Sequence, residues 1–107
     1  MKNVSEETRL RVMRLLAENP NLTQRELAAE LGISLGATNS CLRALIDWGL
    51  VKTENFRKSD NKRAYLYLLT PSGIAQKLSM TRRFIAIKQA EYDAIRKELE
   101  DLRKELP

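Results

Sequence analysis

The chain has 107 residues, enough for one modest domain, and 43% of them are hydrophobic while 31% are charged. A net charge of +5 is compatible with a polyanionic partner such as nucleic acid, and the alternative is a basic surface that only serves solubility. The longest apolar run, residues 64–69, is too short to span a membrane, so we expect no membrane association.

The chemistry-bearing residue types are sparse. There is no histidine, no cysteine pair and no glycine-rich phosphate loop, so the sequence indicates no enzyme, no metal site and no cofactor. The first residues turn acidic at Glu6 and contain no apolar core, so we expect no signal peptide. The single cysteine, Cys41, fits a reducing compartment, and we expect the protein in the cytoplasm.

The first predicted element is an amphipathic helix. Ser5 is suited to cap its start, and apolar residues then recur at helical spacing from Leu10 onward. The turn-forming residues 19–21 predict that this helix ends near Glu18.

Two further helices follow with a short connection. Thr23 and Glu26 have the spacing of a capping box, which predicts where the second helix starts. Gly32 suits the left-handed residue that ends this helix, and Ser34 suits the cap of the next one. A bridge of about three residues between two helices is typical of a helix-turn-helix.

The third helix is expected from about Leu35 to Trp48. The residues that cluster on its inner side are Leu35, Thr38, Leu42, Leu45 and Ile46. The residues on or beside the opposite side are Gly36, Ala37, Asn39, Ser40, Arg43 and Asp47. The leading end of this side is small and neutral, as a helix that enters the major groove of DNA requires, although a merely solvent-facing surface is the alternative.

A β-hairpin is expected next. Residues 49–56 are interpreted as a strand opened by a glycine, residues 57–63 as a polar basic turn, and residues 64–69 as the returning strand. A basic ribbon directly after a helix-turn-helix is typical of a wing. Trp48 and Phe56 are interpreted as core residues.

A long C-terminal helix follows, with Thr70 as its N-cap and Pro71 at its first position. Its apolar residues alternate three and four apart, with imperfections at Thr81 and Lys88, and this is a coiled-coil-like heptad seam. The seam residues expected to mediate dimerisation are Leu78, Ile85, Tyr92, Ile95, Leu99, Leu102 and Leu106.

Charge favours a parallel pairing of this helix with a second copy. In a parallel pair, Glu91 would meet Arg96 of the partner subunit, and Glu98 would meet Arg103 of the partner subunit. An antiparallel pair would place like charges together. The alternative for this segment is a lone helix that folds back on its own domain.

Three segments resemble the MarR family of winged-helix regulators: LAAELGIS at 27–34, LRALIDWGLV at 42–51 and LTPSG at 69–73. The short length and the run YLYLLT at 65–70 are most similar to the branch called MarR family EPS-associated regulators. The resemblance implies a sequence-specific double-stranded DNA-binding regulator of transcription. The branch name implies an association with exopolysaccharide genes.

The resemblance also implies that the third helix enters the major groove while the wing lies over the adjacent backbone or minor groove. The residues expected at base edges or nearby phosphates are Ser34, Gly36, Ala37, Asn39, Ser40 and Arg43. The expected wing contacts are Arg57, Lys58, Lys62 and Arg63. Thr23, Gln24 and the first amides of the second helix are suited to hold a phosphate.

Two departures from the family pattern stand out. Larger MarR proteins carry extra helices that build a dimer base and a pocket for phenolic ligands, and this chain looks too short for that pocket. A small-molecule effector is therefore doubtful. The wing reads DNKR at 60–63 where Asp-x-Arg is common, so the wing contacts are approximate transfers.

The predicted fold is mainly α with a small β-hairpin wing. We expect a winged helix-turn-helix DNA-binding domain over residues 1–73 and a dimerisation helix over residues 74–107. The alternative function is a protein-interaction module, in which the winged helix is a scaffold and the C-terminal helix docks a partner. Cys41, without a resolving cysteine, is interpreted as a packing residue rather than a redox sensor.

Overall fold

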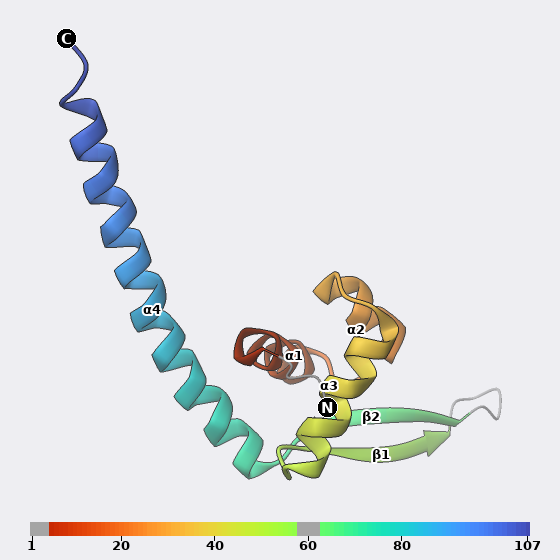
Figure 1. Ribbon diagram of the computed structural model, residues 1–107. Helices are drawn as coiled ribbons and strands as arrows, with labels where there is room; N and C mark the ends of the chain where they lie inside the picture. Colours follow the sequence, from red (N-terminus) through yellow and green to blue (C-terminus); the bar gives the residue numbers. More distant parts are fainter. Residues whose placement is uncertain (1–4, 58–62) are drawn as a thin grey trace. The chain divides into compact units, whose positions relative to one another are not determined.

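The computed structural model describes residues 5–57 and 63–107. Its elements, in chain order, are α1 (Glu6–Glu18), α2 (Gln24–Leu31), α3 (Leu35–Asp47), β1 (Val51–Arg57), β2 (Arg63–Leu69) and α4 (Pro71–Arg103) (Figure 1). This confirms the predicted class, a mainly helical chain with a two-stranded hairpin and a long C-terminal helix. The chain divides into two compact units, one ending at Lys77 and the other comprising Leu78–Pro107.

The predicted N-caps of α1 and α2 are confirmed. The Ser5 hydroxyl accepts a hydrogen bond from the Thr8 amide at 3.1 Å. Thr23 and Glu26 form a complete capping box, in which the Thr23 hydroxyl accepts from the Glu26 amide at 3.1 Å and the Thr23 amide donates to Glu26 Oε1 at 2.9 Å. These bonds satisfy amides that a helix start leaves unpaired, so both starts are defined locally.

The α2–α3 connection has the predicted helix-turn-helix form. Gly32 ends α2 with φ +68°, the left-handed conformation that glycine adopts without strain. Ser34 then caps α3, its hydroxyl accepting from the Ala37 amide at 3.0 Å. From α1, the Arg11 guanidinium donates to the carbonyls of Glu30 and Leu31, each at 3.3 Å, and so closes the C-terminal end of α2.

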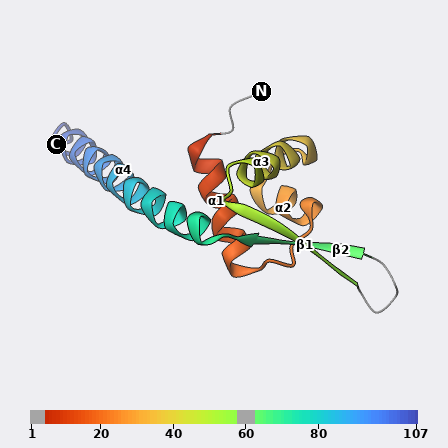
Figure 2. The ribbon, with the colours of Figure 1, turned by 90° about the horizontal axis from the view of Figure 1, so that it is seen from below.

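The core of the first unit lies between the three short helices and the hairpin. Its most deeply buried residues include Val12, Met13, Leu16, Leu27, Leu42, Leu45 and Val51. Figures 1 and 2 show α1, α2 and α3 gathered at the base of the hairpin, while the described strands run past α3 and project beyond the helices.

Three expectations about burial need correction, two on the inner side of the third helix and one at Trp48. Leu35 is 40% exposed because it stands in the first turn of α3, ahead of the helix's buried stretch. Ile46 is only half-buried. Trp48 is 52% exposed rather than in the core, and its ring instead packs under the Arg9 guanidinium, which lies 5.1 Å from the ring centroid. The Phe56 side chain lies outside the described part of the chain.

The hairpin is antiparallel, with Val51 opposite Leu69 at its base and Arg57 opposite Arg63 at its described end. It begins two residues later than predicted because Gly49 and Leu50 lie in the turn that follows the C-terminal end of α3. Gly49 has φ +72°, and the Leu50 amide donates to the carbonyl of Leu45 at 2.9 Å.

The start of α4 is bonded to the residues that precede β1. The Thr70 hydroxyl caps the helix by accepting from the Gly73 amide at 3.0 Å, as predicted, and it donates to the Gly49 carbonyl at 2.6 Å. α4 runs to Arg103, so Leu106 lies beyond the helix end. Within the described ranges, no helix combines the length and apolarity needed to cross a membrane.

Candidate nucleic-acid interface

The outer side of α3 gathers the residues that the sequence assigned to DNA contact. The members that are exposed to solvent are Ser34, Gly36, Ala37, Ser40 and Arg43, and Asn39 is half-buried beside them. They face outward because the opposite side of the helix is buried through Thr38, Cys41, Leu42 and Leu45. The leading end of this surface therefore carries little side-chain bulk, which permits close approach of another molecule.

Ser34 and Thr38 fix the first turn of this surface. The Ser34 carbonyl accepts from both the Thr38 amide at 3.0 Å and the Thr38 hydroxyl at 2.9 Å. Thr38 is fully buried, so this bond satisfies a hydroxyl that has no access to water. The small residues at positions 36 and 37 are thus presented from a rigid helix start.

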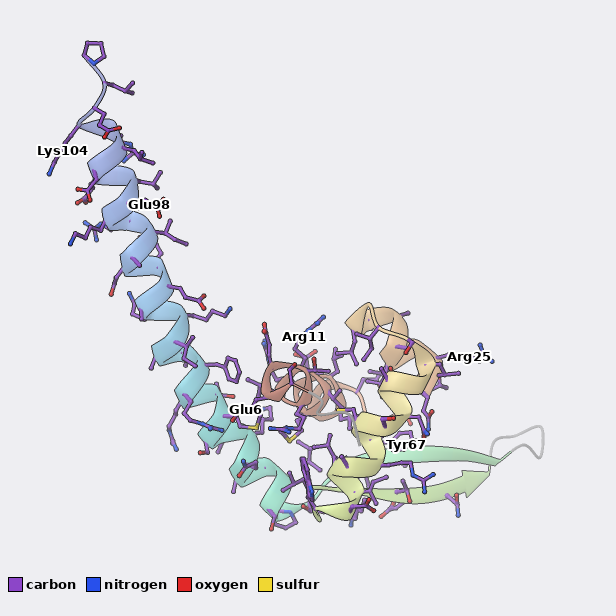
Figure 3. The ribbon with its side chains drawn as sticks, in the orientation of Figure 1. Glu6, Arg11, Arg25, Tyr67, Glu98 and Lys104 are labelled. Carbon is purple, nitrogen blue, oxygen red and sulfur yellow. The ribbon has the colours of Figure 1, made fainter. Side chains whose placement is uncertain are left out.

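Gln24 connects α2 with both neighbouring elements. Its side-chain amide nitrogen donates to Asn39 Oδ1 at 3.3 Å and to the Tyr67 hydroxyl at 3.1 Å. Figure 3 shows Tyr67 on β2 beside α3. Sequence reasoning placed Gln24 among the phosphate contacts and gave no sign of this bridge, because its partners lie 15 and 43 residues away.

The start of α2 carries a cation that sequence reasoning missed. Thr23, the N-cap of α2, is exposed to solvent. Arg25 is exposed in the first turn of the same helix, and its side chain extends outward in Figure 3. A guanidinium beside a helix start suits a phosphate, because the N-terminal end of a helix favours negative charge. The signal that could have revealed it is an arginine two residues after a capping threonine.

The wing cations are described only in part. The register places Arg57 and Arg63 opposite one another at the end of the described strands, so two basic residues share one rung of the ladder. Lys58 and Lys62 lie outside the described residues. Nearer the base, Lys52 is exposed and pairs with Glu54 at 3.7 Å.

Cys41 packs inside the first unit. Its side chain is fully buried, and this desolvation raises the pKa of the thiol to about 11, partly opposed by the positive charge of Arg9. A thiol with so high a pKa is protonated at neutral pH and reacts slowly with oxidants. This agrees with its interpretation as a packing residue.

Clusters of metal ligands and apolar cavities are the usual forms of metal and small-molecule sites. Across residues 5–57 and 63–107, no three His, Cys, Asp or Glu side chains gather as a metal site. An open hollow of about 240 Å³ is lined by Arg11, Arg14, Leu15, Glu18 and Glu30. Its walls are mostly charged, unlike the apolar pockets that usually bind drug-sized ligands.

The second unit, Leu78–Pro107, carries the predicted seam in exposed form. The exposed fraction of the apolar seam residues runs from 45% for Leu99 to 73% for Leu106. The flanking charges include pairs within the helix, with Lys88 3.4 Å from Glu91 and Arg96 3.6 Å from Glu100. Exposed pairs of this kind stabilise a helix by only about 0.3–0.5 kcal/mol each, so they leave the charges free to exchange partners.

The helix-turn-helix and the adjoining hairpin together define a winged helix-turn-helix protein. Residues 5–52 match the family model described as winged helix-turn-helix DNA-binding. No curated protein sequence matches the chain significantly.

Solved structures of transcriptional regulators share this fold. A PadR-like regulator from Bacillus cereus aligns with a TM-score of 0.73 at 13% identity, covering 81% of this chain and 89% of its own. A mutant of S. aureus MepR aligns with a TM-score of 0.65 at 20% identity, covering 97% and 81%. The zinc-dependent MarR family regulator AdcR, in its Zn(II)-bound state, aligns with a TM-score of 0.59 at 22% identity, covering 100% and 79%. At these identities the likeness establishes the fold.

Proposed function

We propose that this protein is a sequence-specific regulator of transcription that binds double-stranded DNA as a dimer. The observation that carries the proposal is the outer side of α3, which presents small neutral residues at its leading end and Asn39 and Arg43 behind them. This is the shape and chemistry that a recognition helix needs in a groove about 12 Å wide. The match of residues 5–52 to a DNA-binding family supports it.

The contacts divide by their chemistry. Asn39 suits an adenine edge and Arg43 a guanine edge or a phosphate, while the small residues Ser34, Gly36, Ala37 and Ser40 allow the helix to come close. The start of α2, with Thr23, the main-chain amide of Gln24 and the exposed Arg25, faces a phosphate. The wing cations Arg57, Lys58, Lys62 and Arg63 hold the DNA backbone without reading its sequence.

The two ends of the chain have separate roles in this proposal. Residues 1–73 form the DNA-binding domain, and residues 74–107 form the dimerisation helix, which pairs in parallel through its exposed seam. The seam supports this because a stripe of large apolar side chains in water is stabilised by pairing. Two recognition helices then address half-sites about one DNA turn, roughly 34–36 Å, apart or a multiple of that.

The regulator is of the MarR type and acts in the cytoplasm. Its sequence resembles the EPS-associated branch, so we include exopolysaccharide genes as the regulated targets. The fold shared with MarR and PadR-like regulators supports the broader class. Its control depends on abundance or on a partner rather than on a small-molecule effector.

One observation favours a second function. The seam of the second unit carries large apolar side chains that are open to solvent, with Ile85, Tyr92 and Ile95 each about 60% exposed. A foreign helix with a matching seam would bury it equally well. In that case the winged helix is a scaffold, and the protein is an interaction module.

The test is retention of sheared genomic DNA by the purified protein, with sequencing of the retained fragments. The control is the double variant Asn39→Ala/Arg43→Ala, which removes both reading side chains, and its circular dichroism checks that it is folded. We expect a few fragments that share a two-fold symmetric motif, and their loss with the variant. Weak retention without sequence preference, equal for both proteins, would refute the regulator and favour the interaction module.

A further inference from the structure

The side chain of Gln24 touches the proposed reading surface from behind. Its amide nitrogen lies 3.3 Å from Asn39 Oδ1 and 3.1 Å from the Tyr67 hydroxyl, so it joins α2, α3 and β2 in one network. Gln24 and Asn39 are half-buried and Tyr67 is buried, so water competes only weakly for these bonds.

Hydrogen-bond chemistry makes this contact directional. The Gln24 amide nitrogen has two hydrogens, and both are used, one on each acceptor. The oxygen of the Asn39 carboxamide is therefore turned toward Gln24. Asn39 Nδ2, the other terminal atom of this planar group, therefore points away from Gln24 and is available to donate a hydrogen bond.

We propose that Gln24 is a positioning residue that sets the base preference of Asn39. By holding Asn39 Oδ1, it presents a hydrogen-bond donor to the major groove and selects a base edge that accepts: purine N7, guanine O6 or thymine O4. It selects against cytosine, whose groove edge is the N4 donor. This inference rests on the proposed function and goes beyond it, because it assigns the specificity of one reading position to a residue that does not touch the base.

The network also holds the wing. Tyr67 pairs with Thr53 in the hairpin ladder, and its amide donates to the Pro20 carbonyl at 3.4 Å, so its ring is fixed in the base of the wing. A hydrogen bond from Gln24 to that ring fixes the donor direction at Asn39 relative to the hairpin. The orientation of the Asn39 side chain is thereby fixed relative to the strands of the wing.

Gln24→Glu tests the direction. A carboxylate has no hydrogen to donate, so it accepts from the Asn39 amide nitrogen and from the Tyr67 hydroxyl instead. Asn39 then turns its oxygen outward, and the preference moves to bases that donate, cytosine and adenine. The matched control is Arg25→Gln, which changes the net charge by the same amount in the next residue and leaves the network intact.

The experiment is selection from a randomised duplex library by wild type, Gln24→Glu and Arg25→Gln, with the retained sequences compared position by position. We expect wild type to disfavour cytosine at one position of each half-site. Gln24→Glu should reverse that preference by about tenfold, the size of one side chain–base contact. Arg25→Gln should weaken retention of all sequences alike and leave the motif unchanged.

The outcomes separate this inference from the proposed function. If wild type enriches no motif, the proposed function fails. If wild type and Gln24→Glu enrich the same motif at every position, the proposed role of Gln24 is wrong. It is also wrong if wild type disfavours cytosine at no position of the half-site. If the circular dichroism of Gln24→Glu shows that this variant does not fold, Gln24→Met is used in its place. That side chain can neither donate nor accept strongly, so discrimination at that position should relax while the remaining positions persist.

Discussion

Gly73 lies against the carbonyl group of Leu50, so close that a Cβ atom at position 73 would collide with the carbonyl oxygen. The same carbonyl accepts from the Thr70 amide at 3.0 Å. The first turn of α4 is therefore seated on the residues that lead into β1, and only glycine fits at this point of contact.

Gly73→Ala should consequently destabilise the first unit. The added methyl group must displace backbone rather than a flexible side chain, which we expect to cost about 2–4 kcal/mol of the free energy of unfolding. Urea denaturation measures it. Gly36→Ala is the control: a Cβ added there would meet Ser34 Oγ only at 4.0 Å, so the variant should stabilise by up to about 1 kcal/mol. Equal midpoints for the two variants would contradict the contact.

Arg43→Ala and Lys62→Ala should affect DNA binding differently. Arg43 is exposed on the reading side of α3, so its loss should weaken binding to the selected site by about tenfold and change random duplex little. Lys62 belongs to the predicted wing tip, and its loss should weaken both duplexes alike and make binding less sensitive to salt. Fluorescence anisotropy with both duplexes at two salt concentrations checks this. An equal loss on both duplexes for Arg43→Ala would overturn its reading role.

A charge placed on the seam of α4 should prevent dimerisation. Ile95→Lys puts an ammonium group in the centre of the seam, where burial in a coiled coil is unfavourable. Light scattering at micromolar concentration should give twice the monomer mass for wild type and the monomer mass for this variant. Ala94→Lys adds the same charge one residue earlier, off the seam, and should remain dimeric. A monomeric wild type would refute the proposed dimer.

Cys41 predicts how stability changes at alkaline pH. Its pKa is about 11 in the folded protein against an ordinary value of 9.0, because burial disfavours the thiolate. Between about pH 9 and pH 11 the unfolded chain loses this proton while the folded chain keeps it, so stability falls as pH rises through that window. Urea midpoints at pH 8 and pH 10.5 should therefore drop more for wild type than for Cys41→Ala. Parallel drops would show that the buried thiol contributes nothing to the pH dependence.

The parts of the fold that were predictable depend on local chemistry. Thr23 and Glu26 are three residues apart, and their capping box forms whatever surrounds it, so the start of α2 could be read from the sequence. The same holds for Gly32, whose positive φ ends the helix. Periodicity likewise defined the buried side of α3 through Leu42 and Leu45.

The parts that were not predictable depend on contacts between distant residues. Helical spacing placed Leu35 on the inner side, but whether anything covers the first turn of α3 is decided by the packing of other elements. Trp48 was interpreted as a core residue, whereas Arg9, 39 positions earlier in the chain, offers its ring a cation at the surface. The bridge from Gln24 to Tyr67 has no sequence pattern, since it needs the hairpin to be in place first.

The position of Trp48 makes it a spectroscopic probe of one unit. It is the single tryptophan of the chain and belongs to the first unit, while α4, with 33 residues, holds about half of the residues in described helices. Tryptophan fluorescence therefore reports on the first unit alone, whereas the circular dichroism of the helices comes from both units. Fluorescence and circular dichroism, recorded on one sample during heating, can therefore distinguish the melting of the first unit from the melting of the second.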